Sequence, residues 1–136
     1  MRLLLASGNA HKLVELRAAL PGWEIGLADA ALPPETGSTF RENARAKAEA
    51  GRAAAPADAW VAGEDSGIEV AALGGRPGVH SARWADDGVA RLLSELGDAQ
   101  DRRARYVCEL VVLAPDGAEL HATGTLAGAI ATSSHT

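Results

Sequence analysis

Residues 2–12 read Arg2-Leu3-Leu4-Leu5-Ala6-Ser7-Gly8-Asn9-Ala10-His11-Lys12. Arg2 and the apolar run from Leu3 to Ala6 predict a short buried strand, and Ser7-Gly8-Asn9 predicts a break after it. From Ala10 the spacing becomes helical, because Leu13, Leu16 and Leu20 fall on one face. The stretch therefore predicts a strand, a tight turn and a helix, with Asn9 as the expected N-cap.

Alternating elements of both kinds follow this first unit. We expect strands over residues 23–28, 59–63, 68–72, 105–114 and 119–125. Helices are expected from the Thr39/Glu42 capping box to about residue 55, and over residues 89–96. The segment 73–84 reads as a loop that contains Gly and Pro. This order predicts an α/β fold with a mixed β-sheet flanked by helices, in a single domain spanning residues 1–136.

The composition excludes several classes of partner. The formal net charge is −5, which argues against a general nucleic-acid binder, since such binding depends on a basic surface. No apolar run approaches the length that spans a membrane. The single cysteine, Cys108, cannot form an internal disulfide and fits a reducing compartment. We therefore expect a cytoplasmic protein that binds neither nucleic acid nor membrane.

The turn over residues 7–12 is the first candidate binding segment. Free N–H groups at a helix N-terminus attract anions, and Lys12 adds a full positive charge one turn into the helix. Asn9 adds a side-chain donor. This combination suits a phosphate, whereas the alternative is an ordinary capped helix with a solvated lysine.

The second candidate segment is the expected helix after residue 38. Asn43 and Lys47 are four residues apart, so they share one face, and Phe40 stands on nearly the same side. Glu35 lies in the preceding loop, where a carboxylate could reach a metal. The alternative is a solvated amphipathic helix.

Two further segments carry charged side chains between apolar stretches. Glu64 and Asp65 are adjacent, and neighbouring strand residues point to opposite faces, so only one of them can face a given site. A carboxylate there could hold Mg²⁺ or activate water, although an acidic β-turn is equally consistent. In the Gly- and Pro-containing loop, Arg83 could bind a phosphate or pair with an acid, and His80 is a weaker candidate.

These segments, in this order, resemble the inosine triphosphate pyrophosphatase family, also called the Ham1-like or dITP/XTP pyrophosphatases. The matching residues are Ser7-Gly8-Asn9-Ala10-His11-Lys12, Glu35-Thr36-Gly37-Ser38-Thr39-Phe40 with Asn43-Ala44 and Lys47-Ala48, Asp65-Ser66-Gly67-Ile68-Glu69-Val70, and Gly78-Val79-His80-Ser81-Ala82-Arg83-Trp84. The ordered set reaches from the N-terminus to Trp84. Its order favours this family over the related Maf-like pyrophosphatases, which have another base preference.

The resemblance implies a fold and a chemistry. The fold would be ITPase/Maf-like, and the activity would be Mg²⁺-dependent hydrolysis of ITP, dITP and XTP to the monophosphate and pyrophosphate by a homodimer. Asp65 would accept the proton of the attacking water, and Glu35 and Asp65 would hold the metal. The implied substrate-binding residues are Ser7, Gly8, Asn9, Ala10, His11, Lys12, Asn43, Lys47, Ser66 and Arg83.

The sequence also departs from the family pattern. Glu64 stands where the family typically has a second Asp, which keeps the charge and lengthens the side chain by one methylene. The family's Phe-Gly-Tyr-Asp-Pro segment, its following Lys and its Ser-His-Arg segment, which form most of the base pocket, have no counterpart here. We therefore expect a domain that lacks the family's C-terminal elements, with weak or absent activity and an exposed sheet edge that lowers stability. A non-enzymatic homologue is the alternative.

Overall fold

The computed structural model describes residues 1–7 and 10–133. Its elements are β1 (Arg2–Ala6), α1 (Ala10–Ala19), β2 (Glu24–Leu27), α2 (Phe40–Ala54), β3 (Trp60–Val70), α3 (Gly88–Leu96), β4 (Arg103–Leu113) and β5 (Glu119–Ala129), with 3₁₀ turns η1 (Ala71–Leu73) and η2 (Gly78–Arg83). The chain divides into two compact units. Unit 1 comprises Met1–Asp65 and Glu109–Ala122, and unit 2 comprises Ser66–Cys108 and Thr123–Thr136.

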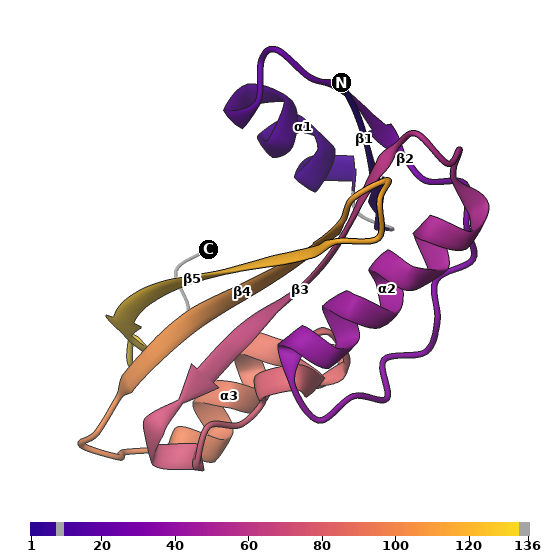
Figure 1. Ribbon diagram of the computed structural model, residues 1–136. Helices are drawn as coiled ribbons and strands as arrows, with labels where there is room; N and C mark the ends of the chain where they lie inside the picture. Colours follow the sequence, from indigo (N-terminus) through magenta and orange to yellow (C-terminus); the bar gives the residue numbers. More distant parts are fainter. Residues whose placement is uncertain (8–9, 134–136) are drawn as a thin grey trace. The chain divides into compact units, whose positions relative to one another are not determined.

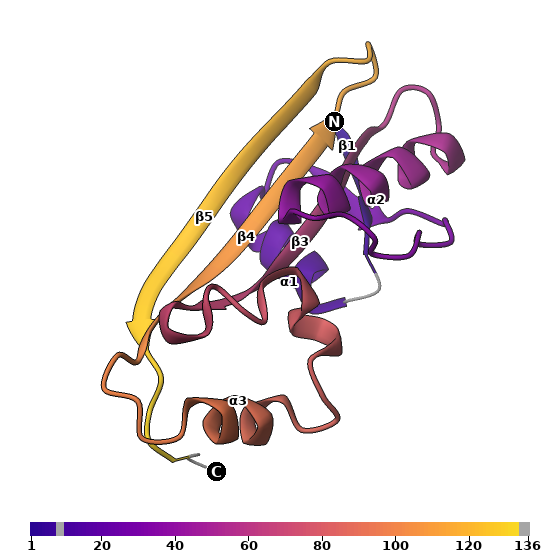
Figure 2. The same cartoon turned by 90° about the horizontal axis from the view of Figure 1, so that it is seen from below.

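The five strands form one mixed sheet in the order β2-β1-β3-β4-β5. β1 is parallel to both of its neighbours, with Leu3 opposite Ile25 on β2 and opposite Trp60 on β3. β4 and β5 lie side by side and are joined by a turn at residues 114–118 (Figure 2). The N–H of Ala114 donates to the carbonyl of Ala118, and the N–H of Ile130 donates to that of Arg102, so these two strands are antiparallel.

In unit 1 the two helices cover opposite faces of the strands (Figure 1). Leu13 and Leu16 of α1, and Leu20 directly after it, pack on the cluster of Leu3, Leu5, Ile25 and Ala62, as their spacing predicts. Ala44 and Ala48 of α2 pack on Val111 instead. Because successive strand residues alternate between faces, β4 offers Val111 to α2 and its neighbours Leu110 and Val112 to the cluster under α1.

The start of α2 follows the predicted cap with one difference. The hydroxyl of Thr39 accepts from the N–H of Glu42 at 3.1 Å, as a capping box requires. The carboxylate of Glu42 accepts from the N–H of Ser38 at 2.8 Å rather than from that of Thr39. The return hydrogen bond therefore ties down the loop before the helix, which also carries Glu35.

β3 corrects the expectation of two strands separated by an acidic turn. Trp60–Val70 is one continuous strand of 11 residues that contains Glu64, Asp65 and both glycines. A Cβ on Gly63 would overlap the backbone of Ala44 and Ala48 in α2, so the small residue permits close helix packing rather than a turn. The residues Gly-Glu-Asp-Ser-Gly have the composition of a turn. The local sequence does not show that a helix packs against Gly63, and for this reason the prediction was wrong.

Unit 2 also differs from expectation in three places. The segment expected as a loop over residues 73–84 contains η2 and the last residue of η1. α3 begins at Gly88, where the carboxylate of Asp87 accepts from the N–H of Ala90 at 3.0 Å. β5 runs to Ala129, four residues beyond the expected end, and all of its residues are exposed. Within the described residues, no helix has the length and apolar character needed to cross a membrane.

Candidate functional site

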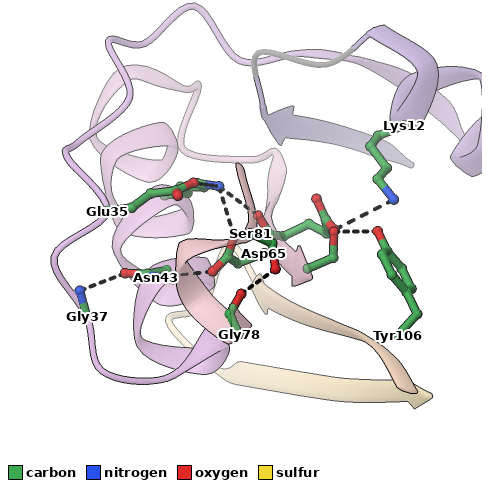
Figure 3. Close-up of polar contacts among 11 residues, drawn as sticks. Lys12, Glu35, Gly37, Asn43, Asp65, Gly78, Ser81 and Tyr106 are labelled. Carbon is green, nitrogen blue, oxygen red and sulfur yellow. Dashed lines mark hydrogen bonds and ion pairs between the residues drawn. The ribbon is translucent and has the colours of Figure 1, made fainter. Parts of the chain in front are cut away.

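Asp65 is the carboxylate that β3 directs toward α2. It is only 6% exposed, and its Oδ2 accepts from the side-chain amide of Asn43 at 3.1 Å. The Oδ1 of Asn43 accepts in turn from the N–H of Gly37 at 2.8 Å. Figure 3 shows Asn43 linking Gly37 to Asp65 in this way. One buried amide therefore orients the carboxylate and holds the loop before α2.

Lys47 brings a second carboxylate to the same place. Its Nζ lies 2.7 Å from Glu35 and 3.7 Å from Oδ1 of Asp65, and it donates to the backbone carbonyl of Glu64 at 3.1 Å. Since Asn43 and Lys47 are one turn apart on α2, the helix places both side chains over Asp65, as their spacing predicts. The carboxylates of Glu35 and Asp65 therefore converge on one point, which the ammonium group of Lys47 occupies.

Glu64 faces the other side of the sheet. Its carboxylate lies 3.7 Å from Nζ of Lys12 on α1. The strand alternation thus separates the two adjacent acids as predicted, with Asp65 toward α2 and Glu64 toward α1. Glu64 is half-buried beside Lys12, so the substitution of Glu for the expected Asp affects a lysine contact rather than the position of Asp65.

The predicted phosphate-binding turn is described only in part. Ser7 follows β1 and is half-buried, while Ala10 and His11 begin α1 and are exposed. Lys12 lies in the first turn of α1, within reach of Glu15 and Glu64. Gly8 and Asn9, including the expected cap, lie outside the described residues.

Ser66 and the residues that hold its strand belong to unit 2. The hydroxyl of Tyr106 on β4 donates to Oγ of Ser66 at 2.7 Å. Further along, the hydroxyl of Ser81 donates to the carbonyl of Gly78 at 2.6 Å and accepts from the N–H of Ile68 at 3.0 Å. Sequence reasoning assigned no role to Tyr106 or Ser81, although the three-residue Gly78–Ser81 spacing is typical of a local hydroxyl-to-backbone bond.

Arg83, at the end of η2, lines a hollow in unit 2. The hollow has a volume of about 430 Å³, and its lining is Arg76, His80, Arg83, Trp84 and Arg91. Glu95 pairs with two of these arginines. Partial burial raises the pKa of Glu95, but hydrogen bonds from Arg91 and Arg76 and their charges outweigh it and leave that pKa below its ordinary value.

The donors around Asp65 suit a hard divalent cation. Carboxylate oxygens are the ligands Mg²⁺ prefers, and it is commonly bound through one or two carboxylates together with substrate phosphates. Glu35 and Asp65 supply two such groups around one point. Across residues 1–7 and 10–133, no three His, Cys, Asp or Glu side chains gather as a metal site, so water or substrate oxygens would have to complete the shell.

Comparisons with known proteins give the chain's relatives. Residues 3–136 match the Ham1 family. A dITP/XTP pyrophosphatase of Synechococcus sp. (strain CC9311) is 47% identical over 88% of this chain, and one of Staphylococcus epidermidis (strain ATCC 12228 / FDA PCI 1200) is 39% identical over 98%. The solved structure of the Staphylococcus aureus Ham1 protein matches with a TM-score of 0.86 and 36% identity, covering 99% of this chain and 74% of that one.

This chain covers a different share of the length of each relative. The chain spans 60% of the length of the Synechococcus relative and 72% of the Staphylococcus epidermidis one. The mixed five-stranded sheet with helices is the fold of these structural neighbours, which confirms the predicted fold class.

Proposed function

The chain belongs to the Ham1 family, and from this membership and the geometry around Asp65 we propose that it hydrolyses non-canonical purine nucleoside triphosphates such as ITP, dITP and XTP to the monophosphate and pyrophosphate. The relatives named above are called dITP/XTP pyrophosphatases, which supports this substrate class. The observation that carries the proposal is the convergence of Glu35 and Lys47 on the buried Asp65. The Ham1 match favours this activity over that of the Maf-like group.

The cofactor we propose is Mg²⁺, held by Glu35 and Asp65. When bound, such an ion neutralises charge on the phosphates and orients them. The buried position of Asp65 excludes most water, and the amide of Asn43 keeps its Oδ2 in one orientation. Oδ1 of Asp65 is the atom that would accept the proton of the attacking water.

The cations of unit 1 supply the phosphate-binding charge. Lys47 already lies between the two carboxylates, so a small shift of its ammonium would bring it to a phosphate oxygen while it still balances the acids. Lys12 sits in the first turn of α1, where helix N–H groups add to its attraction for anions. Asn43 would continue to orient Asp65 through its side-chain amide. The hydroxyl of Ser66, the next residue in the chain, would donate a hydrogen bond to the substrate.

We further propose a homodimer in the cytoplasm, as the family resemblance implies. Sedimentation equilibrium of the purified chain tests the first part, and a mass equal to one chain at all concentrations would refute it.

The test is pyrophosphate release from ITP in the presence of Mg²⁺, compared between the native chain and Asp65→Asn. The substitution keeps the size of the side chain and removes the proton-accepting carboxylate, so we expect kcat to fall at least about 100-fold. Asp58→Asn, the same change at an exposed position, serves as the control and should leave kcat unchanged. Chelation with EDTA should abolish the activity, and added Mg²⁺ should restore it.

Two outcomes would contradict the proposal. No release above background by the native chain would make it a non-enzymatic homologue. Equal rates for the native chain and Asp65→Asn would remove Asp65 from the catalytic step.

A further inference from the structure

Ser66 and Tyr106 form a hydrogen-bonded pair of hydroxyl groups within unit 2. The hydroxyl of Tyr106, on β4, donates to Oγ of Ser66, on β3, at 2.7 Å. Figure 3 shows the hydroxyl end of the Tyr106 ring directed along this bond. A serine oxygen has two acceptor lone pairs and one hydrogen of its own. Accepting from Tyr106 therefore uses one lone pair of Ser66 and leaves its hydrogen for another acceptor.

The backbone next to Ser66 is fixed by a separate contact. Oγ of Ser81, in η2, accepts from the N–H of Ile68, and the same hydroxyl donates to the carbonyl of Gly78. A Cβ on Gly67 would overlap that oxygen, so β3 and η2 approach closely at this point. With the backbone held, the remaining freedom of Ser66 is rotation about its Cα–Cβ bond, which has three staggered positions.

The hydroxyl of Tyr106 is not needed to fill the core. Tyr106 is 44% exposed and borders a hollow of about 170 Å³, which Ile68, Leu126 and Ile130 also line. Removing one oxygen there opens no cavity, and Ser66 is itself only half-buried. Water can replace a hydrogen bond between accessible hydroxyls, so this bond adds little to the free energy of unfolding. What the bond does fix is the direction of the serine oxygen.

We propose that Tyr106 is a positioning residue for nucleotide binding, which holds the hydroxyl of Ser66 in the one rotamer that donates to the substrate. This role rests on the proposed function, in which Ser66 donates a hydrogen bond to a nucleoside triphosphate. Without the tyrosine hydroxyl, Ser66 would distribute among three rotamers, of which one is competent. An apparent dissociation constant rises by the reciprocal of the competent fraction, so loss of this bond should weaken binding about threefold.

The first measurement establishes the pair in solution. Tyr106 is the only tyrosine of the chain, so labelling with ¹³Cζ-tyrosine gives a single NMR resonance from the carbon that carries the hydroxyl. Ser66→Ala removes the acceptor and should shift this resonance. Ser94→Ala, the same change at an exposed position of α3 in unit 2, should not. An unmoved resonance in Ser66→Ala would overturn the proposal.

The second measurement is a double-mutant cycle on nucleotide affinity. The probe is the α,β-methylene analogue of ITP with Mg²⁺, which cannot release pyrophosphate, and calorimetry gives its dissociation constant. Ser66→Ala deletes the donor and should weaken binding about tenfold, while Ser94→Ala should leave it unchanged. Tyr106→Phe keeps the ring and should weaken binding about threefold. The double variant should bind no more weakly than Ser66→Ala alone, because Tyr106 then has nothing left to position.

A role in folding or a direct contact with the nucleotide would give a different result. In either case Tyr106→Phe would weaken binding by the same factor in the Ser66→Ala chain as in the native one, and such additivity would refute the positioning role. Thermal unfolding of Tyr106→Phe should match that of the native chain. A lowered melting temperature would assign the bond to folding and overturn the proposal as well.

The outcome is separable from that of the proposed hydrolysis, because the cycle measures binding and the assay measures pyrophosphate release. A native chain that releases pyrophosphate, with no effect of Tyr106→Phe on affinity, retains the proposed function and loses the positioning role. A native chain that shows the expected cycle but releases no pyrophosphate loses the hydrolysis and retains the positioning role. A native chain that does not bind the analogue overturns the positioning role.

Discussion

β3 and β5 are strands of equal length with opposite surroundings. Each has 11 residues, and each carries two glycines four residues apart, Gly63 and Gly67 in β3 and Gly124 and Gly128 in β5. Every residue of β3 is buried or half-buried, whereas every residue of β5 is exposed. Asp65 and Ser66, two of the proposed site residues, are on β3.

The glycines show what this difference means. A Cβ on Gly63 would overlap the backbone of α2, and one on Gly67 would overlap Ser81 and the carbonyl of Gly78. A Cβ on Gly124 or Gly128 would meet nothing within 4 Å. The same residue at the same spacing is therefore a packing requirement in one strand and only a flexible position in the other. The close approach at Gly63 also brings Asn43 and Lys47 to Asp65.

The largest effect should come from Gly63→Ala. The added methyl group conflicts with backbone atoms of Ala44 and Ala48, which cannot turn away as a side chain could, so we expect the free energy of unfolding to fall by about 3 kcal/mol. Gly124→Ala, the matched change in β5, should stay within about 0.5 kcal/mol of the native chain. Urea denaturation followed by circular dichroism measures both, and equal losses would mean that the two strands do not differ in packing.

A smaller effect is expected when a buried side chain is shortened instead. Val61 on β3 is fully buried, with Gly51 of α2 close to its Cγ1, so Val61→Ala should lower the free energy of unfolding by about 2 kcal/mol through lost burial and a cavity. Leu126→Ala on β5 removes more atoms, yet that side chain is 73% exposed, and the loss should stay below about 0.5 kcal/mol. A larger loss at Leu126 would indicate that a partner covers β5 in solution.

The smallest effect concerns the ion pair at the start of β5. Hydrogen bonds from Arg45, at 2.9 and 2.7 Å, and its charge hold the pKa of Glu119 below its ordinary value. A lowered folded-state pKa stabilises the fold above the unfolded pKa, and this contribution is lost as the pH falls through the folded one. Arg45→Ala should raise the pKa of Glu119 in an NMR titration. Arg103→Ala should leave it unchanged, and an unmoved Glu119 in Arg45→Ala would refute the pairing.

Several site features were predictable because they depend on short-range geometry. Residues four apart on a helix share a face, so Asn43 and Lys47 were expected together. Adjacent residues on a strand face opposite ways, so Glu64 and Asp65 were expected to separate. The contact of Tyr106 with Ser66 was not predictable, because it joins residues 40 positions apart and follows from the pairing of β3 with β4.

By itself, the sequence determined β1, the apolar face of α1, the Thr39 cap, the mixed α/β class and the resemblance to the Ham1 family. Each of these depends on residues within a few positions of one another or on an ordered set of motifs. Only the tertiary structure decided that residues 60–70 form one strand and that Glu35, Asp65 and Lys47 meet at a point. The physical reason is that Gly63 allows α2 to approach β3 closely, and whether a glycine makes a turn or a close contact depends on a partner distant in the sequence.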